Sequence, residues 1–201
     1  DEFNNYLTGR GWTILGGQCY SHTIENPFAP WITVLGSFFG LAATDTIEDR
    51  SQKVLQVVKL SSPGQIELAP LLNTLLTLSL PINEVVSSTD DQILREQFFS
   101  LVTELFRSRS QRNPLMVLIE DVHWIDNSSN ILMKHLMTNL SGCRFLLCLT
   151  RRPQPEIKID LPPTSSSFIT LNELSKPQAI GLILTVLGLS ELPDHVATVI
   201  L

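Results

Sequence analysis

The sequence predicts an α/β fold built on a parallel β-sheet with flanking helices. Two runs, Leu115–Ile119 and Phe145–Leu149, contain only apolar residues, which is typical of strands buried on both faces of a parallel sheet. An amphipathic helical pattern precedes the first run, and another separates the two. Strands that alternate with helices in this way predict parallel crossover connections.

The N-terminal part of the chain predicts a helix end, a short strand and a second helix. Residues 1–10 have the pattern of a helix that ends in a glycine turn, and Trp12–Leu15 is a strand candidate closed by Gly16 and Gly17. A helix is expected to begin at Pro30, because proline is favoured in the first helical turn. Its expected apolar face contains Trp31, Val34, Leu35 and Phe38.

The middle of the chain predicts four more helices. One covers Ile47–Leu60 and stops at the Ser-Ser-Pro-Gly break, and the leucine-rich segment Leu68–Leu80 predicts a buried helix. A longer helix covers Asp90–Arg109, capped by Thr89 or Asp90, and another runs through Leu140 with Asp126 or Ser128 as its cap. The expected apolar face of the longer helix contains Ile93, Leu94, Phe98, Leu101, Leu105 and Phe106.

The C-terminal part predicts one more strand and one more helix. The segment Pro153–Ser167, rich in proline and serine, is poorly suited to regular structure. Phe168–Leu171 is a candidate for a last short strand. Ser175 is positioned to cap a helix with Pro177 in its first turn. The residues Val196–Leu201 have an apolar helical pattern without a stop signal.

Composition excludes several classes of protein. A net charge of −6 and a pI near 5.1 argue against a general nucleic-acid surface. Three cysteines without metal-ligand spacing fit a reducing, cytoplasmic setting better than a disulfide scaffold. The uncharged run Asn26–Thr44 is nearly long enough to span a membrane, but its prolines and glycines favour a buried helix instead.

Two carboxylates, Glu120 and Asp121, directly follow the strand Leu115–Ile119. Ligands of open α/β sheets bind at this carboxyl edge. A hydrophobic strand that ends in two acids is the Walker B pattern, in which one acid holds Mg²⁺ and its neighbour polarises the attacking water. A solvated corner is the ordinary alternative for an acid pair at a strand end, and a transition-metal site that adds His123 and Asp126 is a second alternative.

The segment Glu120–Asp126 extends this pattern to E-D-x-H-W-x-D. It resembles the STAND branch of the AAA-type P-loop ATPases, most closely the ATPase region attached to class III adenylate/guanylate cyclases and to some large transcriptional regulators. Cys19, the Pro-Phe-Ala-Pro-Trp element at Pro27–Trp31 and the segment Ala69–Asn73 fit the order of elements in that family.

The resemblance implies a role for each site residue, with ATP and Mg²⁺ as cofactors. Glu120 holds Mg²⁺, directly or through water, and Asp121 orients the attacking water as the catalytic residue. Arg152 matches a sensor that reads the γ-phosphate, for which the planar guanidinium is suited. Arg151 stands where the family usually has tyrosine, so either arginine can be the one that faces the nucleotide.

His123 has two possible roles. It can sense the bound nucleotide through a hydrogen bond that changes with protonation, or it can pack and hydrogen-bond the loop to the following helix, which is the commoner role for such a residue. Trp124 is expected to anchor the loop.

The phosphate-binding loop G-x-x-x-x-G-K-[ST] does not occur in the sequence, because none of the five lysines is followed by serine or threonine. We therefore expect a partial P-loop NTPase-like sheet that lacks its first strand, which in this superfamily lies between the strands matching Phe145–Leu149 and Phe168–Leu171. Unpaired strand edges at that position would favour aggregation. The predicted domains are a partial ATPase core at residues 1–172 and the start of a helical lid at residues 173–201.

The predicted function is that of an ATP-binding and ATP-hydrolysing switch in a larger cytosolic signalling protein. Its expected partners are ATP or ADP and an output domain of the same parent chain. A nucleotide cyclase is the favoured output domain, and a transcriptional regulator or a kinase is the alternative. We expect no contact with nucleic acid or membrane, and oligomers are possible. By itself this chain is not expected to hydrolyse ATP. The alternative function is a non-catalytic interaction scaffold.

Overall fold

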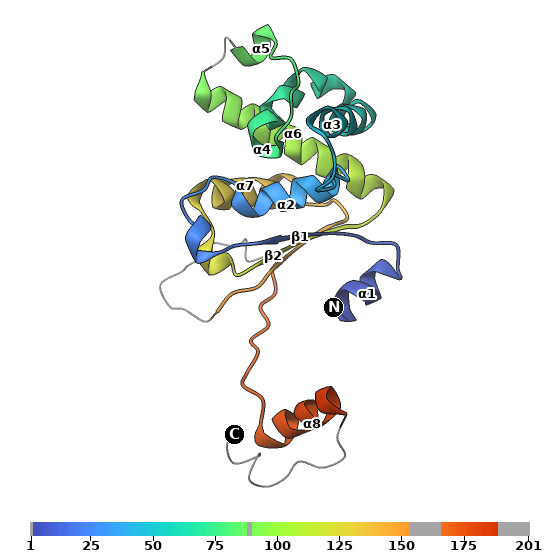
Figure 1. Ribbon diagram of the computed structural model, residues 1–201, viewed down its shortest axis with the longest axis vertical. Helices are drawn as coiled ribbons and strands as arrows, with labels where there is room; N and C mark the ends of the chain where they lie inside the picture. Colours follow the sequence, from blue (N-terminus) through green and yellow to red (C-terminus); the bar gives the residue numbers. More distant parts are fainter. Residues whose placement is uncertain (1, 88–89, 153–165, 189–201) are drawn as a thin grey trace. The chain divides into compact units, whose positions relative to one another are not determined.

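The computed structural model describes residues 2–87, 90–152 and 166–188 (Figure 1). Residues 1–159 and 160–201 form two compact units. The helices of the first unit are α1 (Glu2–Thr8), α2 (Ala29–Phe38), α3 (Ile47–Ser61), α4 (Asn73–Leu76), α5 (Glu84–Ser87), α6 (Asp91–Arg112) and α7 (Asn127–Asn139). Its strands are β1 (Thr13–Gln18), β2 (Leu115–Glu120) and β3 (Phe145–Leu149), and its 3₁₀ segments are η1 (Ser21–Thr23), η2 (Pro63–Leu72) and η3 (Val122–Trp124).

The three strands form one parallel sheet in the order β1-β2-β3, which confirms the predicted fold class. In the register, Leu15 pairs with Val117 and Val117 pairs with Leu147. Helices α2 and α7 lie on one face of the sheet, and α6 lies above them in the view of Figure 1. Because every connection returns the chain to the same end of the sheet, all three strands finish at one edge.

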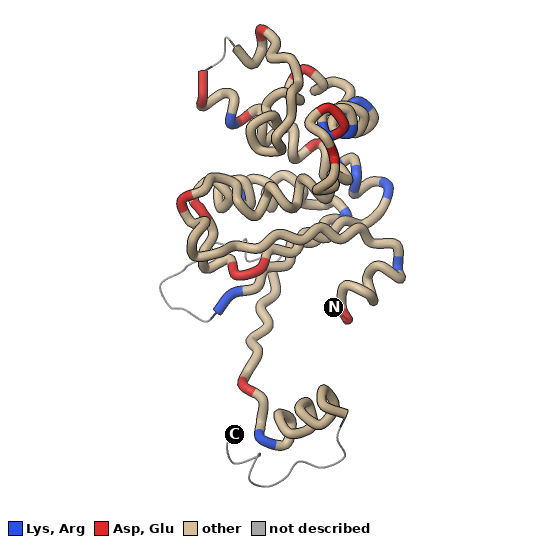
Figure 2. The backbone as a smooth tube through the Cα atoms, viewed as in Figure 1, with Lys and Arg blue, Asp and Glu red and all other residues tan. Residues whose placement is uncertain are grey.

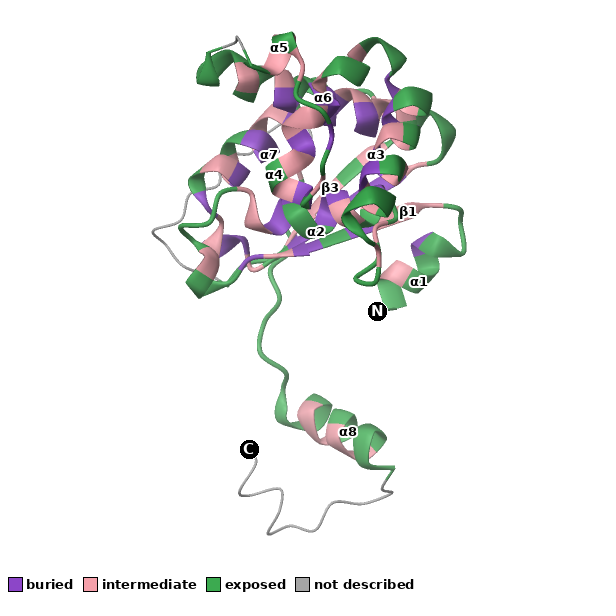
Figure 3. Ribbon diagram, turned by 45° about the horizontal axis from the view of Figure 1, so that its top comes forward, coloured by how far each residue is buried: buried purple, intermediate pink, exposed green. Residues whose placement is uncertain are grey.

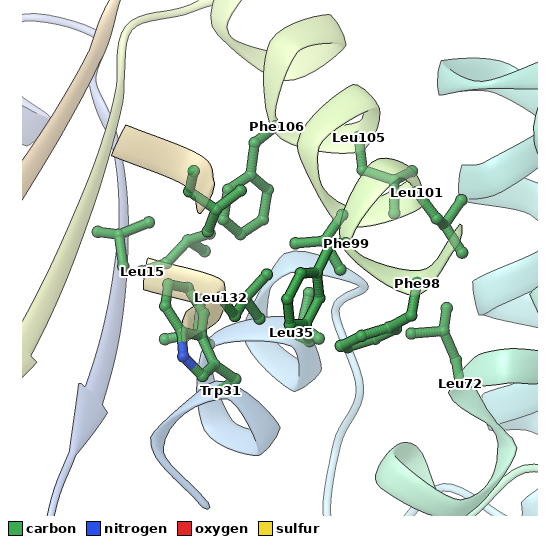
Figure 4. Packing of buried hydrophobic residues seen from close by; sticks show 14 of the residues in the cluster. Leu15, Trp31, Leu35, Leu72, Phe98, Phe99, Leu101, Leu105, Phe106 and Leu132 are labelled. Carbon is green, nitrogen blue, oxygen red and sulfur yellow. The ribbon is translucent and has the colours of Figure 1, made fainter. Parts of the chain in front are cut away.

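The core lies between this sheet face and the helices, where the buried residues gather (Figure 3). Trp31 of α2 is fully buried, and its indole N–H donates to the backbone oxygen of Ser129 in α7 at 3.2 Å. Figure 4 shows Trp31, Leu15 and Leu132 pointing toward the aromatic residues of α6. The predicted apolar face of the helix after Pro30 is therefore confirmed.

Side-chain caps explain where several helices begin. Thr46 and Asp49 form a reciprocal capping box at the start of α3, and the carboxylates of Asp90 and Asp126 accept backbone N–H groups at the starts of α6 and α7. The prediction that Ile93 lies on the buried face of α6 is wrong, since this residue is 49% exposed. Burial on α6 begins only at Phe98, because the first two turns of the helix extend beyond the core.

Two local predictions need correction. Strand β1 does not close at Gly16 and Gly17 but runs through them to Gln18, because β1 stays paired with β2 along its whole length. The segment Leu68–Leu80 is not one helix but the 3₁₀ segment η2 followed by the short α4. Pro70 supplies no N–H to an α-helical ladder, and the Asn73 side chain binds both backbone groups of Leu80, which folds the chain back.

The prediction that β3 is buried on both faces is also wrong. Phe145, Leu147 and Leu149 pack against the core, but Leu146 on the opposite face is 38% exposed. Among the described residues, β3 pairs only with β2 and therefore forms one edge of the sheet. Half-burial of β3 follows from this edge position.

The second unit contains α8 (Lys176–Leu187), whose first turn is capped by Ser175 with Gln178. The predicted start of this helix is confirmed, whereas the predicted strand Phe168–Leu171 does not form. Phe168, Ile169 and Leu171 are 72%, 86% and 89% exposed, and no described strand hydrogen-bonds to them. A strand needs such a partner to satisfy its backbone groups.

Some predictions fall outside the described residues, namely most of the loop Pro153–Ser167, the cap at Thr89 and the pattern Val196–Leu201. The division of the chain at residues 172 and 173 stays a prediction. Over the part of the chain that the structure covers, no helix has both the length and the apolar character needed to cross a membrane.

Candidate functional site

The candidate site lies at the edge where the parallel strands end. Glu120 closes β2 opposite Gln18, the last residue of β1, and its side chain is exposed. The backbone N–H of Cys19 donates to the Glu120 carbonyl at 2.9 Å and extends the pairing by one residue. The acidic pair at the end of β2 and the basic pair after β3 lie at this same edge (Figure 2).

Asp121 turns the chain away from the sheet in a left-handed conformation, with φ 55° and ψ 41°. This conformation is uncommon for a residue other than glycine, although Asp tolerates it better than most. Hydrogen bonds hold the backbone there: Asp121 N–H donates to the Thr150 hydroxyl at 3.2 Å, and Val122 N–H donates to the Thr150 carbonyl at 3.0 Å. The turn after β2 is therefore fixed to the end of β3.

The Asp121 carboxylate has a polar neighbour on β1. The Gln18 amide donates to Asp121 Oδ2 at 3.4 Å, and the Tyr20 hydroxyl donates to the oxygen of the same Gln18 amide at 3.0 Å. The sequence analysis did not identify Gln18 as a site residue. The available signal was its place at the polar end of a strand, but only the β1-β2 register shows that it faces the acid pair.

His123 lies under the turn with its side chain 1% exposed. Its Nδ1 is 3.9 Å from Asp121 Oδ1, and neither ring nitrogen has a hydrogen-bond partner among the described residues. The ring lies against Trp124, with 4.2 Å between the ring centroids. An unpaired buried polar atom lowers the stability of the folded state by about 1–3 kcal/mol, so the burial of the His123 ring without hydrogen bonds needs an explanation.

Asp126 has a structural part in the site. Its Oδ1 accepts the backbone N–H groups of Ser129 at 2.8 Å and Phe28 at 3.1 Å, which caps α7 and ties the start of α2 to it. Burial first, and then the negative charges of Asp126 and Asp121, raise the pKa of the nearby Cys19 thiol to about 12. Cys19 is therefore a neutral, buried thiol at physiological pH.

The two arginines that follow β3 are exposed. The Arg152 guanidinium carbon is 5.8 Å from the centre of the Trp124 ring, within the range of a cation–π contact. The site edge thus contains the five residues for which the resemblance implies a role toward ATP or Mg²⁺: Glu120, Asp121, His123, Arg151 and Arg152.

A comparison of the sequence with models of protein families gives a match to the AAA ATPase domain over residues 1–149. The chain belongs to this family. The matched region runs from α1 through the end of β3 and contains Glu120 and Asp121. No curated protein and no solved structure matches the chain. The predicted AAA-type P-loop ATPase region is thereby confirmed, whereas the resemblance to cyclase-attached ATPases stays a prediction.

The exposure of the acid pair in this AAA ATPase domain is compatible with a hydrated Mg²⁺ ion. In the described residues, no group of three or more His, Cys, Asp and Glu side chains is arranged to hold a metal ion. Mg²⁺ needs no such cage, because it keeps several waters and binds through one or two carboxylates and the phosphates of its nucleotide. Glu120 is exposed and Asp121 is partly exposed, so they fit this use.

Proposed function

We propose that the chain is the ATP-binding and ATP-hydrolysing switch module of a larger signalling protein. The observation that supports this most directly is the placement of Glu120 and Asp121 at the carboxyl edge of a parallel sheet in an AAA ATPase domain. The pair lies where ligands of open α/β sheets bind. Catalysis of phosphoryl transfer consists mostly of positioning and electrostatic stabilisation, which such an edge can provide.

In this proposal the two acids divide the work. Glu120 faces solvent and serves Mg²⁺, directly or through a bound water. Asp121 is held from both sides, by the Thr150 hydroxyl on its backbone and by Gln18 on its carboxylate. A held carboxylate is suited to orient one water molecule against the γ-phosphate. Arg152 or Arg151 supplies the positive charge that reads that phosphate, and Trp124 lies within cation–π range of Arg152.

The wider part of the proposal concerns the parent protein. The bound nucleotide, ATP or ADP, would shift the conformational equilibrium of a helical lid at residues 173–201 and so control an output domain. A nucleotide cyclase is the favoured output domain. A non-catalytic scaffold in a transcriptional regulator or kinase is the competing function. The intact pair Glu120 and Asp121 weighs against it, whereas Arg151, in the place where the related ATPases usually have tyrosine, leaves it open.

Binding of ATP by the full-length protein, with and without Mg²⁺, tests the proposal. We expect Mg²⁺ to tighten ATP binding, and Glu120→Gln to remove most of that gain. Glu104→Gln is the matched control, because Glu104 is a partly exposed acid paired with Arg107 on α6. A folded protein that binds no ATP under any condition would exclude the switch and leave the scaffold.

A further inference from the structure

The His123 ring carries two buried polar atoms whose hydrogen bonds are not made. Its side chain is 1% exposed, and within the described part of the chain Nδ1 and Nε2 both lack a partner. Native proteins pair nearly all their buried polar groups, so an exception at a left-handed turn calls for a functional explanation.

Asp121 is the acceptor that His123 faces. Nδ1 lies 3.9 Å from Oδ1, which exceeds a hydrogen bond by less than about 1 Å. The Asp121 backbone is fixed through Thr150, so the carboxylate can move only by rotation about its own side-chain bonds. Gln18 already approaches the other oxygen, Oδ2, at 3.4 Å.

We propose that His123 is a positioning residue for Asp121. In the reacting arrangement, His123 Nδ1–H donates to Oδ1 while the Gln18 amide donates to Oδ2, so that the carboxylate is held by both oxygens and presents a lone pair to the attacking water. Catalytic hydrogen bonds commonly tighten in the reacting complex, and a base is commonly oriented by a third group. This inference rests on the proposed ATPase function.

Packing alone is the competing role, since the His123 ring also lies against Trp124. Three substitutions separate the two roles. Asparagine places its amide N–H near the position of Nδ1, glutamine places it near Nε2, and leucine fills the volume without a donor. If His123 only fills space, the effect of each substitution should follow the size of the new side chain. If His123 donates from Nδ1 to Asp121, only asparagine can replace it.

The first experiment measures kcat and KM for ATP hydrolysis by the full-length protein. We expect His123→Leu and His123→Gln to lower kcat by about 10- to 100-fold with KM nearly unchanged, and His123→Asn to retain most of kcat. In the Asp121→Asn background, His123→Leu should cause no further loss. Equal losses in the asparagine and glutamine variants, or additive losses in the double variant, would overturn the inference.

A second readout does not require turnover. Histidine labelled with ¹⁵N reports ring N–H groups by NMR, with and without Mg²⁺ and adenylyl imidodiphosphate, a non-hydrolysable ATP analogue. We expect a downfield, slowly exchanging Nδ1–H signal of His123 that disappears in Asp121→Ala, which removes the acceptor. If the wild-type protein hydrolyses no ATP, the proposed function fails and this signal decides alone. Identical His123 signals in wild type and Asp121→Ala under both conditions would overturn the inference.

Discussion

Gly17 of β1 lies against α2, and its replacement by alanine is expected to open β1. An added Cβ would lie 2.6 Å from the Pro30 carbonyl oxygen and 2.9 Å from Val34 Cγ2. The first of these atoms belongs to the backbone, so α2 must shift as a unit. Overpacking of this kind costs about 1–3 kcal/mol. Gln18 follows directly, so the same shift would disturb the contact with Asp121.

Gly16 provides the matched control. No atom lies within 4 Å of the Cβ that alanine would add there, and its φ is not in the left-handed region. Gly16→Ala should therefore be neutral or more stable by up to about 1 kcal/mol, because it restricts the unfolded chain.

Amide hydrogen exchange in β1, Thr13–Gln18, measures the difference locally. We expect exchange to accelerate by about 5- to 150-fold in Gly17→Ala, which corresponds to the loss of about 1–3 kcal/mol, and to stay equal or slow in Gly16→Ala. Equal exchange in the two variants would refute the close approach of α2 to β1.

Three further predictions concern the packing around the site. Asp126→Ala removes the cap of α7 and leaves the Phe28 N–H without its acceptor, so urea denaturation should show an unfolding free energy lower by about 2–4 kcal/mol. Asp126→Asn keeps Oδ1 and should lose less than half as much. Equal losses in the two variants would contradict this role of Asp126. Trp31→Phe removes the hydrogen bond to Ser129 and part of a buried ring. The unfolding free energy should fall by about 2–3 kcal/mol in the same assay. A decrease below about 0.5 kcal/mol would contradict the burial of Trp31 in the core. The pKa of Cys19 is raised from 9.0 to about 12 in the folded protein. Between pH 9 and 12 the unfolded chain releases the thiol proton while the folded chain keeps it. The stabilisation contributed by the Cys19 thiol is therefore complete below pH 9 and is lost as the pH rises toward 12. Cys19→Ala should flatten the pH dependence of the unfolding free energy between pH 9 and 12 relative to wild type, and an unchanged slope would contradict the raised pKa.

Local patterns were sufficient to predict much of the fold. The apolar run of β2 and the caps at Asp90 and Asp126 are properties of short segments, and the structure agrees with each of them. The acid pair Glu120 and Asp121 follows directly from the strand that precedes it. Such features depend on residues within a few positions of one another, which a sequence shows.

The failures concern contacts between distant segments. Phe168–Leu171 has strand-forming residues, but a strand exists only beside a partner, and no described segment pairs with it. The extension of β1 through Gly17 depends on its pairing with β2, and the contact of Gln18 with Asp121 depends on the register of these two strands, 103 residues apart at that contact. Burial of His123 likewise depends on packing that no local pattern records.

The most direct test of the proposed function is the rate of ATP hydrolysis by the full-length protein and its Asp121→Asn variant, with bound nucleotide measured in the same samples. The proposed function predicts that the variant binds Mg²⁺-ATP as wild type does and loses about 100- to 10,000-fold in turnover. Turnover that is equal in the two proteins would contradict a catalytic role for Asp121 and with it the proposed site at the end of β2.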